Sequence, residues 1–181
     1  MTQVFLDLDG VLVDFISGAC KHHGVTNPYL NPVNHGQVDL APLLGMSNEA
    51  FWGGMGYDFW ANLPWLDTGR EILKAIYAYV PIERITILTS PIQTPGCAEG
   101  KIAWIKNNLY AFRRKFFVGP PKEVIAAPGK LLIDDFDKNV DKWQVNGPVI
   151  QVPALWNRFH AIPTVNYVKA QLEIYFANDH D

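Results

Sequence analysis

The chain carries four short runs of apolar residues, and polar residues follow the first three. The segments that contain these runs cover residues 3–8, where the apolar run is Val4 to Leu6, and residues 85–88, 130–133 and 148–152. Near-continuous runs of Val, Ile and Leu are typical of parallel strands that are covered on both faces. The pattern therefore predicts four buried strands, three of which deliver polar side chains to a strand end.

Two helical patterns lie between these runs. Residues 68–79 place four apolar side chains on one face, and residues 98–109 place three more at helical spacing. Strands that alternate with helices indicate an α/β fold with a parallel sheet. In such sheets ligands bind at the carboxyl ends of the strands, which is where the polar residues fall.

Residues 16–65 have a different composition from the rest of the chain. They are rich in Gly, Asn, Pro and aromatic residues and contain few β-branched runs. We expect a small, mostly helical or irregular cap that is inserted after the first strand and lies over the mouth of the sheet. The predicted organisation is a catalytic core of residues 1–15 and 66–181 with residues 16–65 as the cap.

Composition and charge narrow the classes of partner. A net charge of −3 and a pI of about 5.9 argue against a sequence-independent grip on polynucleotides, which depends on clustered Lys and Arg. No apolar run reaches membrane-spanning length, and the first residues lack the pattern of a signal peptide. We therefore expect a cytoplasmic protein without membrane association. The sequence leaves the oligomeric state open, a homodimer included.

Two acids stand where the first strand should end. Asp7 and Asp9 follow an apolar run directly and are followed by Gly10. Burying an ionised carboxylate without a partner is costly, and two nearby carboxylates raise each other's pKa. Side chains two positions apart share a face of a strand. One of the pair could attack a phosphorus atom while the other moves a proton, or both could bind a metal without turnover.

A second acid pair repeats the problem at the end of the third run. Asp134 and Asp135 follow Leu131, Leu132 and Ile133. Four carboxylates that converge on one place would repel each other strongly unless a cation lay among them. Mg²⁺ binds such oxygen ligands and completes its octahedron with waters and a substrate phosphate. Asp7, Asp9, Asp134 and Asp135 are therefore the predicted metal ligands.

Hydroxyl and lysine side chains complete the set of candidate phosphate contacts. Thr89 and Ser90 follow the second strand, where a hydroxyl and backbone N–H groups suit a phosphate oxygen, although a plain helix cap is the simpler interpretation. Neutralising a phosphate from the side opposite the metal calls for a lysine. Lys122 precedes the third strand and Lys130 begins it, and the two remain competitors for this role.

The residues named above, in this order, resemble the motifs of the haloacid dehalogenase superfamily of phosphohydrolases. The matching residues are Asp7-Leu8-Asp9-Gly10-Val11, Thr89, Lys122 and Asp134-Asp135. A closer similarity, over nearly the whole chain, is to the 5'(3')-deoxyribonucleotidase family. The segments that carry it are 7–15, 88–91 and 132–135, together with Asn139, Trp143 and Phe59-Trp60 before Leu63-Pro64.

The resemblance implies a fold and an activity. The fold would be a Rossmann-like core of the haloacid dehalogenase type with a helical cap. The activity would be Mg²⁺-dependent removal of phosphate from small-molecule nucleoside monophosphates. By position, Asp7 would be the nucleophile and Asp9 the acid/base, while Thr89 and Lys122 would hold the phosphate.

Aromatic residues are the candidates for contact with a nucleobase. The resemblance places Phe15 against the base, and Phe51, Trp52 and Trp60 are further candidates for stacking. Each of the three is also explained by a small apolar core within the cap. Two other function classes stay open: a phosphatase for another small phosphoester such as a sugar phosphate, and a non-catalytic relative that binds Mg²⁺ and phosphate.

Overall fold

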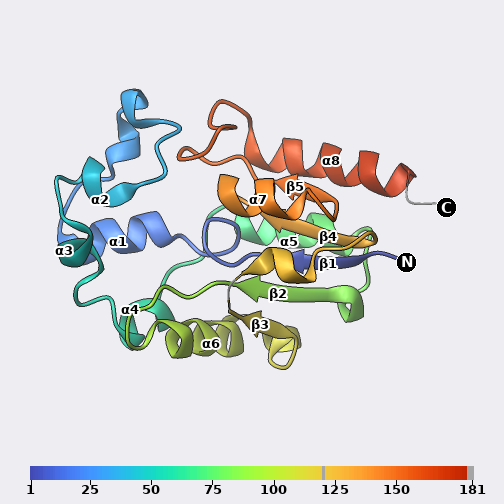
Figure 1. The fold of residues 1–181 in the computed structure, drawn as a ribbon, viewed down its shortest axis with the longest axis horizontal. Helices are drawn as coiled ribbons and strands as arrows, with labels where there is room; N and C mark the ends of the chain where they lie inside the picture. Colours follow the sequence, from blue (N-terminus) through green and yellow to red (C-terminus); the bar gives the residue numbers. More distant parts are fainter. Residues whose placement is uncertain (120, 179–181) are drawn as a thin grey trace.

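The structure, a computed structural model, describes residues 1–119 and 121–178. Residues 120 and 179–181 of the predicted core therefore lie outside the described residues. Within that part of the chain the fold is α/β, with one five-stranded parallel sheet and eight α-helices (Figure 1). The strands are β1 (Gln3–Leu6), β2 (Ile85–Thr89), β3 (Phe116–Val118), β4 (Lys130–Asp134) and β5 (Val149–Gln151). The α-helices are α1 (Phe15–His23), α2 (Leu40–Leu43), α3 (Asn48–Trp52), α4 (Tyr57–Ala61), α5 (Gly69–Tyr77), α6 (Cys97–Asn108), α7 (Asp137–Trp143) and α8 (Thr164–Asn178).

The strand order in the sheet is β3-β2-β1-β4-β5, and every neighbouring pair is parallel. The first strand of the chain is thus the central one. Helical crossovers are needed to return the chain between parallel strands, which explains the alternation of strands and helices in the sequence. The four predicted strands and two predicted helices are present, and the α/β prediction is confirmed.

Alternation along the strands divides the core between the two faces of the sheet. Val4 and Leu6 of β1 belong to the larger apolar cluster, which residues of α5, α6 and α8 complete. Phe5 lies between them in sequence and belongs to a smaller cluster with Trp143 of α7. Because successive side chains of a strand point to opposite faces, the sheet is the middle of three layers.

The first strand ends two residues before the end of the predicted segment, residues 3–8. After Leu6 the chain turns through Gly10, whose φ of +73° is in the left-handed region that favours glycine. Backbone hydrogen bonds close this loop, among them Gly10 N–H to the Val13 carbonyl at 2.9 Å. Asp7 and Asp9 therefore belong to a loop and not to a strand face.

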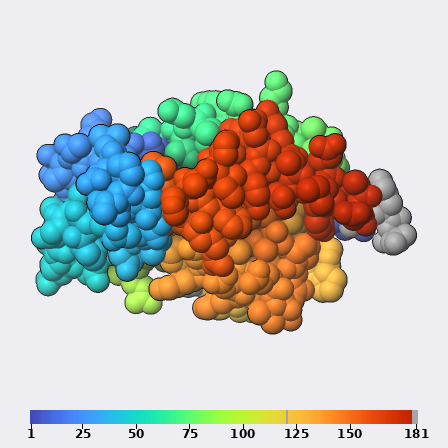
Figure 2. Space-filling view, turned by 90° about the horizontal axis from the view of Figure 1, so that it is seen from above, coloured from blue at the N-terminus to red at the C-terminus, as the bar shows by residue number. Residues whose placement is uncertain are grey.

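Residues 16–65 gather at one end of the molecule. Figure 1 shows α1 to α4 beyond the carboxyl ends of the strands, and Figure 2 shows the same segment at one end, with α8 along the face in view. This segment has an apolar cluster of its own, which includes Tyr29, Phe51 and Met55. Trp60 and Leu63, in contrast, belong to the larger cluster of the sheet. The division into core and cap stays a prediction.

The approach of α4 to α6 depends on a residue without a side chain. A Cβ atom at Gly100 of α6 would lie 2.6 Å from the Cβ atom of Trp60 and 2.7 Å from the carbonyl oxygen of Tyr57. Both distances are shorter than the contacts that packed atoms allow. The absence of a side chain at position 100 therefore allows the two helices to pack closely.

Replacing Gly100 with alanine tests this contact. We expect Gly100→Ala to lower the free energy of unfolding by about 1–3 kcal/mol, since overpacking forces the helices apart and outweighs alanine's better helix propensity. Urea denaturation gives the value. Gly119→Ala is the matched control, because a Cβ atom there meets nothing within 4 Å. Equal stabilities of the two variants would contradict the close-packing argument.

Candidate metal and phosphate site

The polar residues predicted at strand ends meet at the carboxyl edge of the sheet. Asp7 follows β1, while Thr89 and Asp134 are the last residues of β2 and β4. The register pairs Leu6 with Ile87 on one side and with Ile133 on the other. The three strand ends are therefore level, which brings polar side chains from distant parts of the chain to one place.

Three buried carboxylates form a group that could hold a metal ion. Asp7, Asp134 and Asp135 each offer an oxygen, and these oxygens all lie within 4.8 Å of one another. Carboxylate oxygens are the ligands of hard divalent cations such as Mg²⁺ and Ca²⁺. Leaving three such charges buried together without a cation would be expensive. The donor set therefore fits a hard divalent cation.

The pKa shifts of these acids indicate the same shortage of positive charge. Burial raises the pKa of Asp135 well above its usual range, and the charges of Asp134 and Asp7 raise it further. Burial also raises the pKa of Asp134, although Lys122 opposes that shift. The protein supplies one buried ammonium group against three carboxylates at this position. A bound cation would complete the compensation.

That ammonium group belongs to Lys122, which lies between two of the acids. Its Nζ atom is 2.6 Å from Oδ1 of Asp7 and 2.7 Å from Oδ2 of Asp134, and the residue is only 2% exposed. Burial alone would lower the pKa of Lys122, but the charges of Asp134 and Asp7 outweigh it and hold that pKa above its usual value. Lys122 therefore stays charged.

The other candidate lysine lies at the amino ends of the strands, away from the acids. Lys130 begins β4, pairs in register with Gln3, and donates from Nζ to the Ile125 carbonyl at 3.1 Å. Its ammonium group is thus engaged a whole strand length from the acids. Of these two lysines, Lys122 is therefore the one that lies beside the acids.

Several neighbours hold the acid pair of β4 in place. Asp134 accepts hydrogen bonds from the backbone N–H of Phe136 at 2.8 Å and from Nδ2 of Asn139 at 3.0 Å. Asp135 accepts a hydrogen bond at Oδ2 from the indole N–H of Trp156. The backbone carbonyl of Asp135 accepts another from Nδ2 of the buried Asn157 at 2.7 Å. The two carboxylates are therefore fixed independently of each other.

Gly10 lets the first loop approach the acid pair. A Cβ atom at this position would lie 2.3 Å from Oδ2 of Asp135, closer than any side chain could sit. Together with its positive φ, this contact explains why the two acids of the first motif are followed by glycine.

Asp9 has a different environment from Asp7. Its carboxylate lies outside the group of three, because the ammonium group of Lys101 holds Oδ2 in an ion pair. The other oxygen, Oδ1, is buried and has no hydrogen-bond partner among the residues that the structure describes. The sequence groups Asp9 with the metal ligands, whereas the geometry separates its side chain from them.

Lys101 is a site residue that the sequence interpretation missed. It is 3% exposed, and its Nζ atom donates to Asp9, to Oγ1 of Thr89 at 3.0 Å and to the Ser90 carbonyl at 3.0 Å. All three N–H donors of the ammonium group are thus used. A signal was present, because Lys101 shares the buried face of α6 with Ile105, four positions later.

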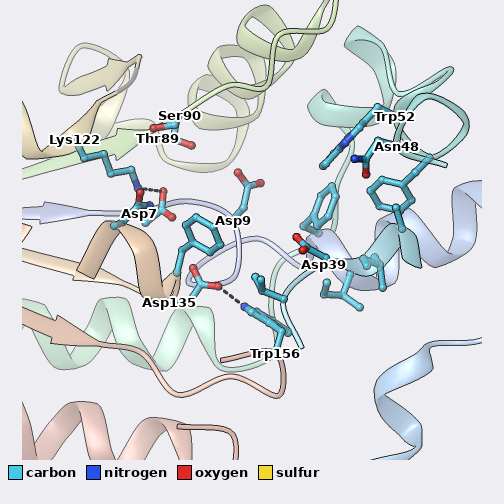
Figure 3. A pocket seen from close by; sticks show the side chains of 18 residues that line it. Asp7, Asp9, Asp39, Asn48, Trp52, Thr89, Ser90, Lys122, Asp135 and Trp156 are labelled. Carbon is cyan, nitrogen blue, oxygen red and sulfur yellow. Dashed lines mark hydrogen bonds and ion pairs between the residues drawn. The ribbon is translucent and has the colours of Figure 1, made fainter. Parts of the chain in front are cut away.

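A cavity of about 540 Å³ opens over these residues (Figure 3). Asp7, Thr89 and Lys122 lie on one side of the view, and Asp39 and Trp52 lie on the other, with Asp9 between the two sides. The full lining is Asp7, Asp9, Phe15, Ile16, Val38, Asp39, Leu40, Ala41, Asn48, Phe51, Trp52, Thr89, Ser90, Lys122, Asp135, Phe136, Asn139 and Trp156. The cavity therefore joins the acids to an apolar and aromatic wall from residues 15–52.

The predicted base-contacting aromatics divide between this wall and the core. Phe15, Phe51 and Trp52 line the cavity, although Phe51 is nearly fully buried. Trp60 does not line it, because its indole is buried and donates to the Met55 carbonyl at 2.9 Å. Trp60 instead stacks on Phe15 with an interplanar angle of 12°. Trp60 thus supports the wall from behind, and contact of any of these rings with a base stays a prediction.

A scan against protein-family models and a search of curated proteins both find no match to this chain. No helix among residues 1–119 and 121–178 combines the length and the apolar character that a membrane crossing requires.

The carboxylate group predicts a response to divalent cations. A folded-state pKa above the unfolded value makes the metal-free protein less stable as pH rises through the raised pKa of Asp135. A bound cation relieves this penalty, because it supplies the positive charge that the ionised carboxylates lack. We expect Mg²⁺ to raise the melting temperature at pH 7, and less so at pH 5, where protons compete with the cation.

Asp135→Asn separates this effect from general salt stabilisation. The variant should melt higher than the wild type without metal, by about 2–4 °C per kcal/mol of repulsion removed, and should lose the Mg²⁺-induced rise. Glu83→Gln removes one charge at the amino end of β2 and should behave as the wild type does. Differential scanning calorimetry with EDTA or Mg²⁺ measures both. An unchanged Mg²⁺ response in Asp135→Asn would exclude the acids as the binding group.

The lysine assignment predicts unequal costs for two substitutions. Lys122→Met leaves Asp7 and Asp134 buried without their cation, so we expect a loss of about 3–5 kcal/mol in EDTA. Lys130→Met removes a single hydrogen bond to a carbonyl and should cost no more than about 1.5 kcal/mol. Urea denaturation of both variants compares them directly. Equal losses would show that the carboxylates do not depend on Lys122.

Proposed function

We propose that the protein is a Mg²⁺-dependent phosphatase of the haloacid dehalogenase type that acts on nucleoside monophosphates. In this proposal residues 16–65 are the cap that covers the active site. Asp7, Asp134 and Asp135 hold the cation, and Thr89, Ser90 and Lys122 contact the phosphate. The resemblance of the motifs and the convergence of their residues at one cavity support this assignment.

One observation carries the proposal: two aspartates only two positions apart have different partners. Asp7 belongs to the carboxylate group and pairs with Lys122. Asp9 pairs with Lys101 and keeps a buried oxygen that has no hydrogen-bond partner within residues 1–119 and 121–178. A protein that only binds a metal and phosphate has no use for this second carboxylate. Two separate environments suit two separate roles, a nucleophile and a proton carrier.

The first half of the reaction uses both aspartates. A carboxylate oxygen of Asp7 attacks phosphorus, the bond from phosphorus to the ester oxygen breaks, and the electron pair leaves with that oxygen. Asp9, which has to be in its protonated form at this stage, gives its proton to the departing oxygen as general acid and becomes the carboxylate that pairs with Lys101. Lys122 and the hydroxyl of Thr89 stabilise the charge on the phosphoryl oxygens. When bound, Mg²⁺ would add Lewis-acid stabilisation of the same charge.

The second half regenerates the carboxylate of Asp7. A water gives its proton to Asp9 and attacks phosphorus, and the bond between phosphorus and the Asp7 oxygen breaks. Inorganic phosphate is released, and Asp9 is again protonated. Splitting one slow displacement into two steps is the general advantage of a covalent route. Lys101 holds Asp9 in position through both steps.

The cavity supports a nucleotide as the substrate. Its volume of about 540 Å³ is in the range typical of small-molecule sites. Trp52 lies on the side away from Asp7 in Figure 3 and stacks on Phe15, so this side of the cavity is aromatic, and aromatic rings stack well on planar bases. A small sugar phosphate would leave this wall without a function.

Substitution of the two aspartates tests the proposed roles. Asp7→Asn should lower the rate of phosphate release by more than about a thousandfold, because the nucleophile is lost. Asp9→Asn should lower it by about a hundredfold to ten-thousandfold, the usual value of general acid–base catalysis. The assay measures phosphate released from dUMP and p-nitrophenyl phosphate with Mg²⁺ or with EDTA, and Glu83→Gln serves as the control for a lost charge.

The outcomes separate the function classes. Activity of Asp7→Asn near that of the wild type would remove Asp7 as the nucleophile. A folded wild type that releases no phosphate in Mg²⁺ would favour the non-catalytic binding protein. Equal rates on dUMP, dTMP, AMP and a sugar phosphate would contradict the proposal that the aromatic wall binds a nucleobase. The protein would then be a phosphatase without preference for nucleotides.

A further inference from the structure

The wall of the cavity away from the acid group carries a charged side chain, that of Asp39. Asp39 lines the cavity, yet it makes no hydrogen bond or ion pair within residues 1–119 and 121–178. It precedes α2 without accepting a hydrogen bond from the helix. Its neighbours in the lining are the apolar Val38, Leu40 and Ala41. A carboxylate among apolar residues is the polar group that would fix the orientation of a ligand.

The backbone next to Asp39 is held by a buried tyrosine. Tyr29 is 2% exposed, and its hydroxyl donates to the carbonyl of Gln37 at 2.6 Å. The adjacent Gly36 donates its N–H to the Leu155 carbonyl at 2.8 Å. These bonds fix the segment two and three residues before Asp39. The carboxylate is therefore carried on a defined backbone instead of on a free loop.

The same contacts connect Asp39 to the carboxylate group. The ring of Tyr29 lies against that of Trp156, with centroids 6.0 Å apart. Trp156 in turn donates to Asp135. Side chains from three separate segments thus set the distance between the acid end of the cavity and Asp39. A ligand that spans both ends would meet two positioned groups.

The charge of Asp39 reaches this tyrosine. Burial is the main reason that the pKa of Tyr29 is raised to about 12, and the negative charge of Asp39 is the next. The carboxylate thus gives this part of the cavity a negative potential. A second anionic group on a substrate, such as the far phosphate of a bisphosphate, would be repelled there.

We propose that Asp39 is a specificity residue that accepts a hydrogen bond from the organic part of the substrate. An ionised carboxylate only accepts hydrogen bonds, so its partner is a donor group. Among pyrimidine nucleoside monophosphates the donors remote from phosphate that differ from one substrate to the next are the exocyclic amine of cytosine, N3–H of uracil and the ribose 2'-hydroxyl, and the proposal is restricted to these. The inference rests on the proposed phosphatase function and narrows its substrate to molecules with such a donor and a single phosphate.

Asn48 gives this end of the cavity a second polar group. It lies beside Trp52 in Figure 3, and its side chain makes no hydrogen bond within the described part of the chain. Its amide can both donate and accept, so it does not select for a donor as a carboxylate does. Discrimination between donor-bearing and donor-free substrates therefore falls to Asp39.

Four nucleotides resolve which donor is used. The values of kcat/KM for dCMP, dUMP, CMP and UMP are measured with the full chain in Mg²⁺. If Asp39 accepts from a base amine, the cytosine nucleotides exceed the uracil nucleotides by about tenfold to hundredfold, the value of a hydrogen bond to a charged group. If it accepts from N3–H of uracil, the uracil nucleotides exceed the cytosine nucleotides, and if it accepts from the 2'-hydroxyl, the ribonucleotides exceed the deoxyribonucleotides.

Asp39→Asn assigns the preference to this residue. The variant keeps the size of the side chain and adds a donor, so we expect it to bring the preferred ratio to within about threefold of unity. Glu83→Gln removes one charge at the opposite edge of the sheet and should keep the wild-type ratio. Asp39 is exposed, so the substitution should leave the fold intact, and the melting temperature checks this.

The results separate failure of this inference from failure of the proposed function. Turnover without any preference among the four nucleotides, or a preference that Asp39→Asn retains, would overturn the role of Asp39 and leave the phosphatase standing. Absence of phosphate release by the wild type from every nucleotide and from p-nitrophenyl phosphate would overturn both.

Discussion

The rest of the site depends on one constraint: three buried carboxylates share a single buried ammonium group, so their negative charge is not fully compensated. Asp7, Asp134 and Asp135 come from two neighbouring strand ends, and Lys122 is the cation between two of them. Such a group is tolerated only if each charge has hydrogen-bond partners and a further positive charge is at hand. The glycine of the first loop and the donors around β4 are consequences of this requirement.

The donor to Asp135 has a second effect on the architecture. Trp156 binds the carboxylate with its indole N–H and lies against Tyr29 with its ring. The cavity therefore has its acid end and its opposite wall joined by a short chain of packed side chains. This arrangement suits a site that must hold a substrate at two places, because the separation between those places is then fixed before binding.

Much of the fold is predictable from the sequence, because its central strands are buried on both faces. The strands over 3–6, 85–89 and 130–134 appear as apolar runs, and the acids after them stand out because burying them is costly. The third strand of the chain, Phe116–Val118, escapes detection. It is an edge strand of only three residues, Phe-Phe-Val, and Phe117 is more than half exposed, so its apolar run is too short to stand out as a buried strand. Helix α8 is also not predicted, because it buries few side chains and therefore shows no clear apolar face in the sequence.

The site residues that the sequence does not reveal are those whose role comes from tertiary contacts. Lys101 and Trp156 meet Asp9 and Asp135 across 92 and 21 positions of the chain. Trp156 resembles an ordinary loop aromatic, and the one local sign at Lys101, its place on the buried face of α6, does not identify its partner. The motif around Asp7 can be found from sequence alone because its chemistry lies within a few residues. Lys101 and Trp156, which contact Asp9 and Asp135, can be identified only when the folded structure is known.

The loop after β1 explains how two acids so close in sequence come to differ. An extended strand would place Asp7 and Asp9 on one face and in one environment. The strand ends at Leu6, and the chain then turns through a loop that contains Gly10. In this loop the side chain of Asp9 lies beside α6, where Lys101 pairs with it. Asp7 stays with the strand ends and with Lys122. Because each aspartate has its own lysine, two carboxylates within three residues of chain occupy different electrostatic environments.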